Sequence, residues 1–232
     1  MQTTPSLQDA ESKPENGWLL GPALCSASWG GVSVRLSDCM DVMAEYPDKH
    51  FDLAIVDPPY GIGEDGGKCR TRGSKRTNGT SKNWDKETPP TEYFDELRRV
   101  SRNQIIWGGN YFTDKIPPSR CWIYWQKDMG GDFADGELAW TSFDRVVKQW
   151  RKRSETFGRI HPTQKPVKLY RWLLENYAKP GQRILDTHLG SGSSAIACAQ
   201  FGCEMTGCEI DSEYFADAVE RIGRELKQGV LL

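Results

Sequence analysis

The apolar run FDLAIV, residues 51–56, constrains the fold of this chain more than any other feature of its sequence. The run is continuous rather than alternating, and it stops at Asp57, Pro58 and Pro59. A run of this kind is typical of a strand buried on both faces, as in a parallel sheet covered by helices. Because proline has no N–H to donate to a neighbouring strand, the strand should end at the aspartate.

Strands and helices are expected to alternate along most of the remaining chain. The predicted strands are 31–36, 51–56, 103–109, 120–126, 182–186 and 203–210, and the predicted helices are 38–47, 90–101, 163–178, 190–202 and 211–227. This alternation predicts an α/β fold with an open, doubly wound, mostly parallel sheet. In such sheets the ligand binds beyond the carboxyl ends of the strands, at a topological switch point.

Length and composition indicate a single large domain. The 232 residues are 38% hydrophobic, which suffices for one core over residues 18–232, whereas residues 1–17 are polar and predict a flexible N-terminal extension. The seven cysteines include no C-x-x-C pair, which favours reduced thiols. With no apolar leader and no long uncharged apolar run, we expect a cytoplasmic protein without a membrane segment.

A second strand end also carries an unusual sequence, ILDTHLGSGSS. Gly190 and Gly192 allow the backbone to approach a ligand where the following helix begins, although a tight strand-to-helix turn explains the glycines equally well. Glu209 ends the next strand, at the spacing at which a carboxylate can accept both hydroxyls of a ribose. The combination favours a cofactor that contains adenosine.

The DPPY sequence at residues 57–60 suits chemistry on an aromatic amino group. Such an amine is a poor nucleophile until both of its hydrogens are held, and the Asp57 carboxylate with the Pro58 carbonyl offers two acceptors side by side. Tyr60 supplies a flat face for a nucleobase taken out of its stack. A turn that merely ends the strand is the alternative when DPPY is considered alone.

Basic residues gather in two segments. Residues 61–86 contain seven Lys and Arg against three Asp and Glu, with many glycines, which predicts a mobile basic loop. A second basic stretch surrounds Trp150, within an irregular segment, 127–160, that is our candidate for target recognition. The predicted contacts to DNA phosphates are Lys68, Arg70, Arg72, Lys75, Arg76, Lys148, Arg151 and Arg153.

Three motifs occur in the order DPPY, HPTQKP and DTHLGSGSS, and in this order the chain resembles the DNA amino-methyltransferases of the permuted β group. The resemblance implies a Rossmann-like methyltransferase domain with S-adenosylmethionine as methyl donor and no metal. It assigns catalysis to Asp57, Pro58, Pro59 and Tyr60. It assigns the donor site to Asp38, Asp57, Lys165, Asp186, His188, Gly190, Ser191, Gly192 and Glu209, with Lys165 at the donor carboxylate and His188 in place of the family's usual aromatic.

The resemblance also implies a reaction and its partners. The expected reaction is site-specific transfer to the N6 amine of a flipped-out adenine in double-stranded DNA, as in restriction-modification and phage enzymes, with cytosine-N4 transfer as the alternative. An aspartate at the first motif position favours adenine. A dinucleotide-dependent oxidoreductase and a catalytically silent DNA-binding protein are further alternatives. Enzymes of this group are often dimers, so a homodimer is one expected assembly.

Overall fold

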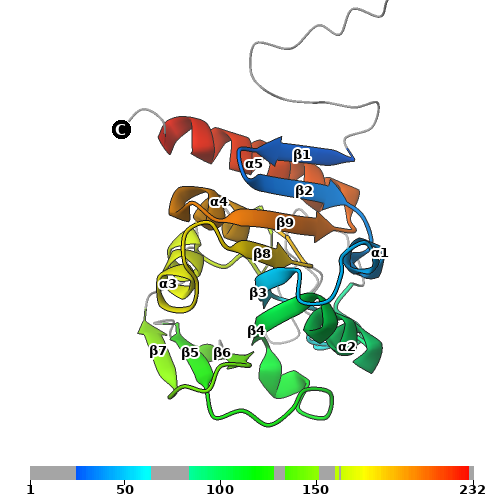
Figure 1. Cartoon of the computed structure of the whole chain (residues 1–232), viewed down its shortest axis with the longest axis vertical. Coiled ribbons are helices and arrows are strands. Elements are labelled where there is room, and N and C mark those ends of the chain that lie inside the picture. The colour runs from blue at the N-terminus through cyan, green and yellow to red at the C-terminus, as the bar shows by residue number, and fades with distance from the viewer. Residues whose placement is uncertain (1–24, 64–83, 128–133, 152–159, 162, 230–232) are drawn as a thin grey trace, which may run out of the picture.

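The computed structural model describes residues 25–63, 84–127, 134–151, 160–161 and 163–229 (Figure 1). Within these residues, nine strands form one sheet in the order β1-β2-β9-β8-β3-β4-β6-β5-β7. The strands are β1 (Ser26–Trp29), β2 (Val32–Leu36), β3 (Phe51–Val56), β4 (Ser101–Trp107), β5 (Trp122–Gln126), β6 (Gly136–Thr141), β7 (Lys148–Arg151), β8 (Arg183–Asp186) and β9 (Glu204–Glu209).

The centre of the sheet is parallel, from β2 through β9, β8 and β3 to β4. The antiparallel pairs lie nearer the edges, where β1 pairs with β2, and β6 lies between β4 and β5. From β3 the chain crosses over to β4, whereas from β8 it crosses over in the other direction to β9. The boundary between β3 and β8 is therefore a topological switch point, where ligands bind in sheets of this kind.

Helices cover both faces of the sheet (Figure 1). One core cluster joins the sheet to α3 (Val167–Tyr177), α4 (Ser193–Phe201) and α5 (Ser212–Gly229), and the other joins it to α1 (Cys39–Ala44) and α2 (Thr91–Val100). A short 3₁₀ helix, η1 (Gly109–Tyr111), follows β4. The predicted doubly wound α/β fold is confirmed.

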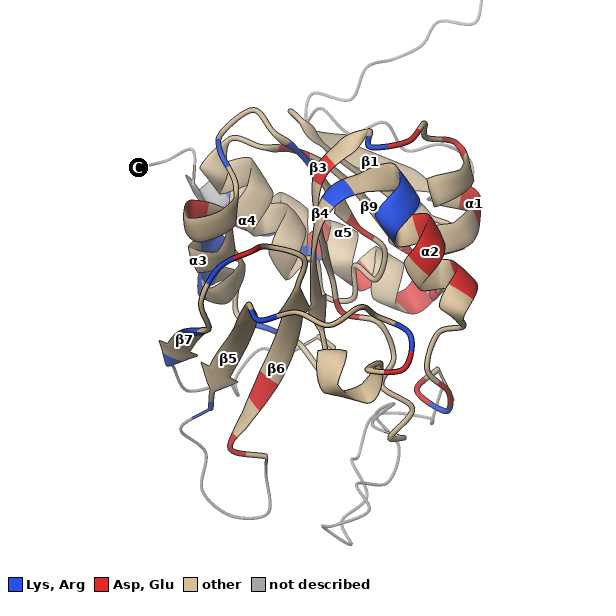
Figure 2. Cartoon of the chain, turned by 60° about the horizontal axis from the view of Figure 1, so that its bottom comes forward, with Lys and Arg blue, Asp and Glu red and all other residues tan. Residues whose placement is uncertain are grey.

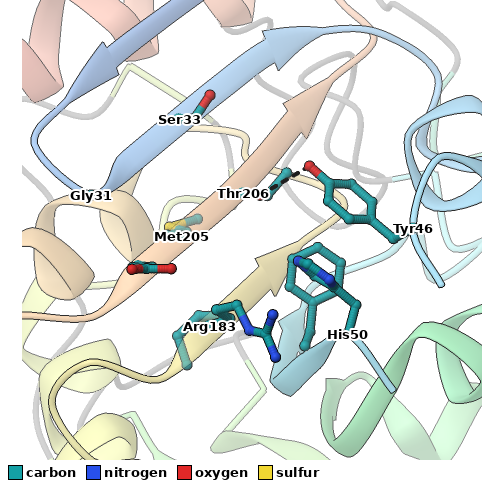
Figure 3. Close-up of a pocket in the computed structure, with 10 residues that line it drawn as sticks. Gly31, Ser33, Tyr46, His50, Arg183, Met205 and Thr206 are labelled. Atoms are coloured by element: carbon teal, nitrogen blue, oxygen red, sulfur yellow. Dashed lines mark hydrogen bonds between the residues drawn. The ribbon is translucent and has the colours of Figure 1, made fainter. Parts of the chain in front are cut away.

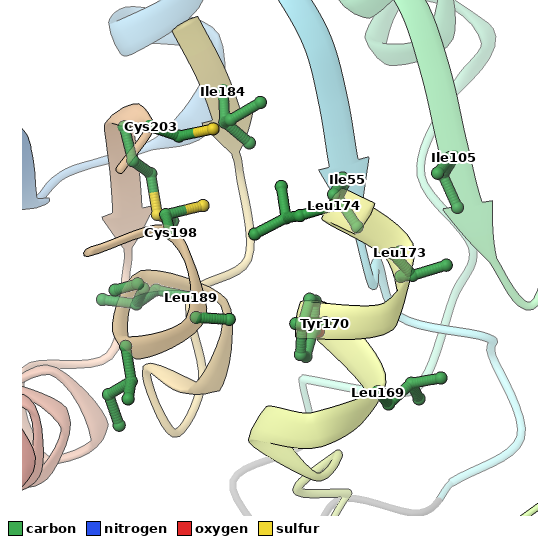
Figure 4. Close-up of a cluster of buried hydrophobic side chains, with 14 of the residues drawn as sticks. Ile55, Ile105, Leu169, Tyr170, Leu173, Leu174, Ile184, Leu189, Cys198 and Cys203 are labelled. Atoms are coloured by element: carbon green, nitrogen blue, oxygen red, sulfur yellow. The ribbon is translucent and has the colours of Figure 1, made fainter. Parts of the chain in front are cut away.

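Side chains of β3 alternate between these two clusters. Leu53 and Ile55 pack with the α3 side, and Ala54 and Val56 pack with the α2 side. Figure 4 shows Ile55 of β3 near Leu174 of α3, and Leu173 of the same helix toward Ile105 of β4. Burial on both faces explains why the FDLAIV run is apolar throughout.

The sequence prediction was wrong in the segment 127–160, which has no clear period yet contains β6 and β7. The last three residues of β6 are all buried, and β7 is a four-residue strand with only Trp150 partly covered. Neither strand therefore has the alternation that reveals a strand in a sequence. Strand β1 was also not predicted.

Two predicted segments fall outside the described part of the chain. They are the N-terminal extension, residues 1–17, and residues 64–83 of the basic loop. Among the described residues, no helix is both long and apolar enough to span a membrane.

Gly109 offers a test of how β6 is held against the end of β4. A Cβ at this position would lie 2.5 Å from Cβ and 2.9 Å from the backbone nitrogen of Trp140 in β6. Gly109→Ala should therefore destabilise the protein by about 1–3 kcal/mol, because β6 must shift to relieve the overlap. Thermal unfolding measures the effect. Gly31→Ala is the matched control, since its Cβ would meet its nearest atoms at 3.4 Å, an ordinary contact; equal melting temperatures for the two variants would contradict the packing described.

Candidate active site

Asp57 leaves the carboxyl end of β3 at the switch point, with its side chain 15% exposed. Pro58 is buried, and Pro59 is half-buried. The Tyr60 hydroxyl turns back and donates a hydrogen bond of 2.6 Å to Asp57 Oδ1. The DPPY segment is thus a rigid elbow in which the tyrosine fixes the orientation of the carboxylate.

Asp85 holds this elbow from the far end of the basic loop. Its side chain is 2% exposed, and Oδ1 accepts hydrogen bonds from the backbone N–H groups of Tyr60 at 2.7 Å and Gly61 at 2.8 Å. Its backbone carbonyl accepts a third hydrogen bond from the Gly63 N–H. Sequence reasoning missed Asp85, which is the only acidic residue of the NWDK stretch that ends the loop.

The Tyr60 ring is packed against the end of β4. Gly108 has φ +69°, and a Cβ there would lie 2.2 to 2.7 Å from ring atoms of Tyr60, so the close approach requires glycine. Tyr111, which is 42% exposed, stacks on Tyr60 with ring centroids 5.0 Å apart and planes 15° apart. One face of the tyrosine predicted to receive a base is therefore covered by another aromatic side chain.

Lys165 lies between two carboxylates at the centre of the site. Its ammonium pairs with Asp57 Oδ2, lies 3.1 Å from Glu137 Oε2, and donates to the Tyr60 hydroxyl at 3.3 Å. It also lies 5.2 Å from the centre of the Trp107 ring, and its side chain is 2% exposed. Lys127 pairs with the other oxygen of Glu137. The result is a buried chain of alternating charges, Lys127, Glu137, Lys165 and Asp57, which we call the charge chain.

The members of the charge chain shift one another's pKa values. Burial raises the pKa of Asp57, and the Lys165 ammonium offsets this rise only in part. Burial would also raise the pKa of Glu137, but the two lysines outweigh it and lower that pKa to about 2. Burial opposes the charge of Lys165, yet the two carboxylates prevail and raise its pKa. Lys165 is therefore an ammonium at neutral pH.

Asp186 and His188 lie at the end of β8, beside Asp57 across the switch point. Asp186 is 1% exposed and accepts hydrogen bonds from Ser194 Oγ at 2.5 Å and from the His188 N–H at 3.0 Å, and burial raises its pKa to about 7. The His188 ring contacts Tyr93 edge-on, with centroids 5.5 Å apart, and burial lowers its pKa to about 4. His188 is thus a neutral ring at the position where the sequence comparison expected an aromatic.

Glu209 ends β9 and fixes the glycine loop. Its carboxylate accepts hydrogen bonds from the backbone N–H groups of Gly190 at 2.9 Å and of Ile210 and Asp211 at 3.0 Å. Asp38 lies next to it, because the register of β2 pairs Leu36 with Glu209. The exposed Asp38 side chain caps α1 by accepting from the Met40 N–H at 2.7 Å.

The two loop glycines differ in what they approach. A Cβ on Gly192 would lie 2.7 Å from Cδ1 of Ile222 in α5, so this glycine permits α4 and α5 to pack. A Cβ on Gly190 would meet only ring atoms of His161, at 3.7 Å. Ser191 is buried, and its carbonyl accepts a hydrogen bond from Arg221 at 2.7 Å. Of the two glycines, only Gly190 could carry a Cβ without overlap, and the His161 ring lies beside it.

The predicted DNA-contacting residues lie apart from these groups or outside the described chain. Lys148 and Arg151 are exposed at the two ends of β7, the edge strand of the sheet. Figure 2 shows basic residues on β7, and both acidic and basic residues on α2. Those outside the described residues are Lys68, Arg70, Arg72, Lys75, Arg76 and Arg153.

A small cavity of about 190 Å³ lies at the opposite, amino end of the central strands (Figure 3). Tyr46, His50 and Arg183 are among its lining residues. It is separate from the site described above, where Asp57 and Glu209 follow the carboxyl ends of their strands. Among the described residues, no cluster of three His, Cys, Asp or Glu side chains could hold a metal ion.

The pKa of Asp186 predicts a dependence of stability on pH. In the unfolded chain an aspartate titrates near pH 4, so between about pH 4 and 7 the native state binds a proton that the unfolded state does not. Asp186 therefore contributes stability that is present below pH 4 and is lost as the pH rises toward 7. Asp186→Asn should remove this loss. The free energy of unfolding of the variant, relative to that of wild type, should therefore increase by up to about 1.4 kcal/mol for each pH unit between pH 4 and 7.

Urea unfolding at several pH values measures this difference, with Asp95→Asn on the exposed surface of α2 as control. A difference between Asp186→Asn and wild type that stays constant from pH 4 to 7 would show that Asp186 is not protonated in the folded protein.

Comparison with known proteins identifies relatives over most of the chain. The model of a DNA methylase family, N6/N4, matches residues 106–220. The chain is 26% identical over 212 residues to the putative methylase YubD of Escherichia coli K12, covering 83% of this chain and 92% of YubD. It is 22% identical to the type II methyltransferase M.HinfI of Haemophilus influenzae, covering 84% of this chain and 69% of that enzyme.

Solved structures of similar fold also cover most of the chain. The complex of M1.HpyAVI with SAM has a TM-score of 0.56 at 17% identity and covers 82% of this chain and 98% of its own. The cytosine-N4-specific PvuII DNA methyltransferase has a TM-score of 0.57 at 10% identity and covers 85% of this chain and 92% of its own. At these identities the structures establish the Rossmann-like fold of the methyltransferases alone. By its match to the family model and its named relatives, the chain is similar to the N6/N4 DNA methylases.

Proposed function

We propose that this protein transfers a methyl group from S-adenosylmethionine to the N6 amine of an adenine flipped out of double-stranded DNA. The observation that carries the proposal is the meeting of two strand ends at one switch point. Asp57 follows β3, Asp186 ends the adjacent β8, and Glu209 ends β9 beside it. An acceptor for an amine thus lies next to a loop suited to an adenosine-containing donor.

The residues of the donor loop fit S-adenosylmethionine. The Glu209 carboxylate is held in place by three backbone N–H groups, and an oxygen fixed in this way can also accept the hydroxyls of a ribose. Asp38 follows the neighbouring strand β2, and Gly190 leaves the loop backbone without a side chain where a ligand would approach. The neutral ring of His188 can lie against an uncharged purine without a desolvation cost for charge.

The donor would supply a methyl group already activated by its sulfonium, so the protein's part is to present the amine in line with it. Asp57 accepts one hydrogen of the amine, and we assign the second to the Pro58 carbonyl. Holding both hydrogens draws the nitrogen toward tetrahedral geometry and frees its lone pair for attack. Tyr60 provides a stacking surface for the base once Tyr111 makes room.

Adenine is the preferred target because Asp57 occupies the first motif position, where the resemblance to the family associates aspartate with adenine. Cytosine is the second candidate, since its N4 amine presents the same two hydrogens to Asp57. Digesting methylated DNA to nucleosides after reaction with labelled donor identifies the product directly. Methyl label in deoxycytidine would contradict adenine as the target and identify cytosine instead. DNA without label would refute methyl transfer to DNA as the function.

DNA binding is assigned to the basic residues of both segments. Strand β7 runs parallel to β5, so Arg151 and Gln126 lie at the same end of their strands. Asp57 follows β3 at this same end of the sheet. Cations at this end can neutralise phosphates beside a flipped base. The same proposal includes contacts to DNA phosphates by Lys68, Arg70, Arg72, Lys75 and Arg76. It also includes the formation of a homodimer.

Asp57→Ala should lower the rate of methyl transfer by about 10²–10⁴-fold, because the amine loses its acceptor. Binding of the donor should be largely preserved, since Asp57 acts mainly on the target. Transfer of labelled methyl groups to DNA and calorimetry with the donor measure the two effects. Because Lys165 loses a partner in this variant, thermal unfolding must confirm that the protein is folded. A folded variant with undiminished turnover would exclude Asp57 from catalysis.

Glu209→Ala should weaken donor binding by about 10- to 100-fold, the value of hydrogen bonds to a charged acceptor. Gly190→Val should weaken it further, because φ is +51° at this position and the added side chain enters the donor space. Glu209→Gln keeps an acceptor for the Gly190 N–H and separates loss of charge from distortion of the loop. Glu220→Ala, exposed on α5, is the control. Unchanged affinity in folded Glu209→Ala and Gly190→Val variants would place the donor elsewhere.

A further inference from the structure

Both oxygens of the Asp57 carboxylate are engaged in the structure. Oδ1 accepts the Tyr60 hydroxyl at 2.6 Å, and Oδ2 is paired with the Lys165 ammonium. The proposed reaction needs Asp57 to accept a hydrogen from the target amine. A nitrogen with N–H donors, that of Lys165, thus already occupies a position on the carboxylate that the amine requires.

The surroundings of the Lys165 ammonium also resemble those expected for the amine of a bound base. It lies 5.2 Å from the centre of the Trp107 ring and 5.8 Å from that of Tyr60, so aromatic faces flank it. The ammonium donates hydrogen bonds to Asp57 and to the Tyr60 hydroxyl, and it forms an ion pair with Glu137 Oε2 at 3.1 Å without a hydrogen bond. If Asp57 were released, Glu137 would still hold the ammonium.

We propose that Lys165 is a positioning residue that occupies the amine's place on Asp57 in the DNA-free enzyme, and that Glu137 retains the lysine when the target amine displaces it. The proposal rests on the proposed function, because it assumes that Asp57 accepts the amine. Lys165 thereby lowers the pKa of the buried carboxylate, and Glu137 prevents the lysine from holding that carboxylate permanently.

The charges around Asp57 support this division of roles. Carboxylates reach the lysine from β3 and from β6, and Lys127 at the end of β5 balances the second of them. The other titratable groups facing the cluster are Tyr60, Tyr170 of α3 and Asp186 of β8. Burial raises the pKa of both tyrosines, so they stay neutral, and Lys165 is the cation in contact with Asp57.

Removing either partner of Lys165 should change the pKa of Asp57 in opposite directions. Without Lys165, the buried Asp57 carboxylate has no adjacent cation and should stay protonated to higher pH. Without the charge of Glu137, Lys165 is held by Asp57 alone, which should lower the pKa of Asp57 and make the lysine harder for the amine to displace.

The test measures single-turnover methyl transfer against pH, with labelled S-adenosylmethionine and unmethylated genomic DNA. In Lys165→Met the acidic limb of the profile should move up by at least about one pH unit, and raising the pH should restore part of the rate. In Glu137→Gln the limb should move down, and the plateau rate should fall by about tenfold. Lys168→Met, exposed on α3, is the charge-matched control and should follow the wild-type profile.

Donor binding separates this role from one at the donor carboxylate. Calorimetry should give nearly wild-type donor affinity for both variants, and circular dichroism should confirm that they fold. The proposal would be overturned if the acidic limbs of the two variants stayed in place or moved in the same direction. It would also be overturned if Lys165→Met lost donor affinity while its acidic limb stayed in place. If Lys165→Met does not fold, Lys165→Gln replaces it, and Glu137→Gln tests the opposite shift independently. Wild-type protein that labels no DNA at any pH would instead refute the proposed function.

Discussion

The parallel pairing of β3 with β8 is the constraint on which the site depends. The register joins Leu53 to Ile184 and Ala54 to Leu185, so Asp57, which follows β3, and Asp186, which ends β8, lie at the same end of the paired strands. Because the crossovers leave the two strands in opposite directions, the boundary between them is a topological switch point. Burial of β3 on both faces fixes the strand, and the prolines after Asp57 end it abruptly.

Burial determines how the carboxylates at the carboxyl ends of β3 and β8 are stabilised. A carboxylate out of water needs a close cation or a proton, and the site uses both solutions. Asp57 has Lys165 beside it, and Lys165 is shared with Glu137, which in turn is paired with Lys127. Lys165 thus opposes the rise in the pKa of Asp57, whereas Asp186 across the switch point has no such cation in contact among the described residues, and its pKa rises to about 7.

Sequence reasoning found the parts of the site that end predicted strands, because a strand end is a local signal. Asp57 and Glu209 were placed in this way, and the fold followed from the alternation of elements. It missed Asp85 and Glu137, whose contacts with Gly61 and Lys165 each span at least 24 residues of the chain and whose surroundings have no periodicity. The resemblance placed Lys165 at the donor carboxylate, whereas its ammonium lies against Asp57 and Glu137, since only the folded sheet brings β6 alongside β4.

A crystal structure of the protein with S-adenosylhomocysteine tests the central claim, that donor and amine meet at the switch point between β3 and β8. The account predicts the ribose hydroxyls on the Glu209 carboxylate, the adenosine beside Gly190, and the sulfur facing Asp57. Adenosine bound instead in the cavity lined by His50 and Arg183, at the amino end of the strands, would contradict the account.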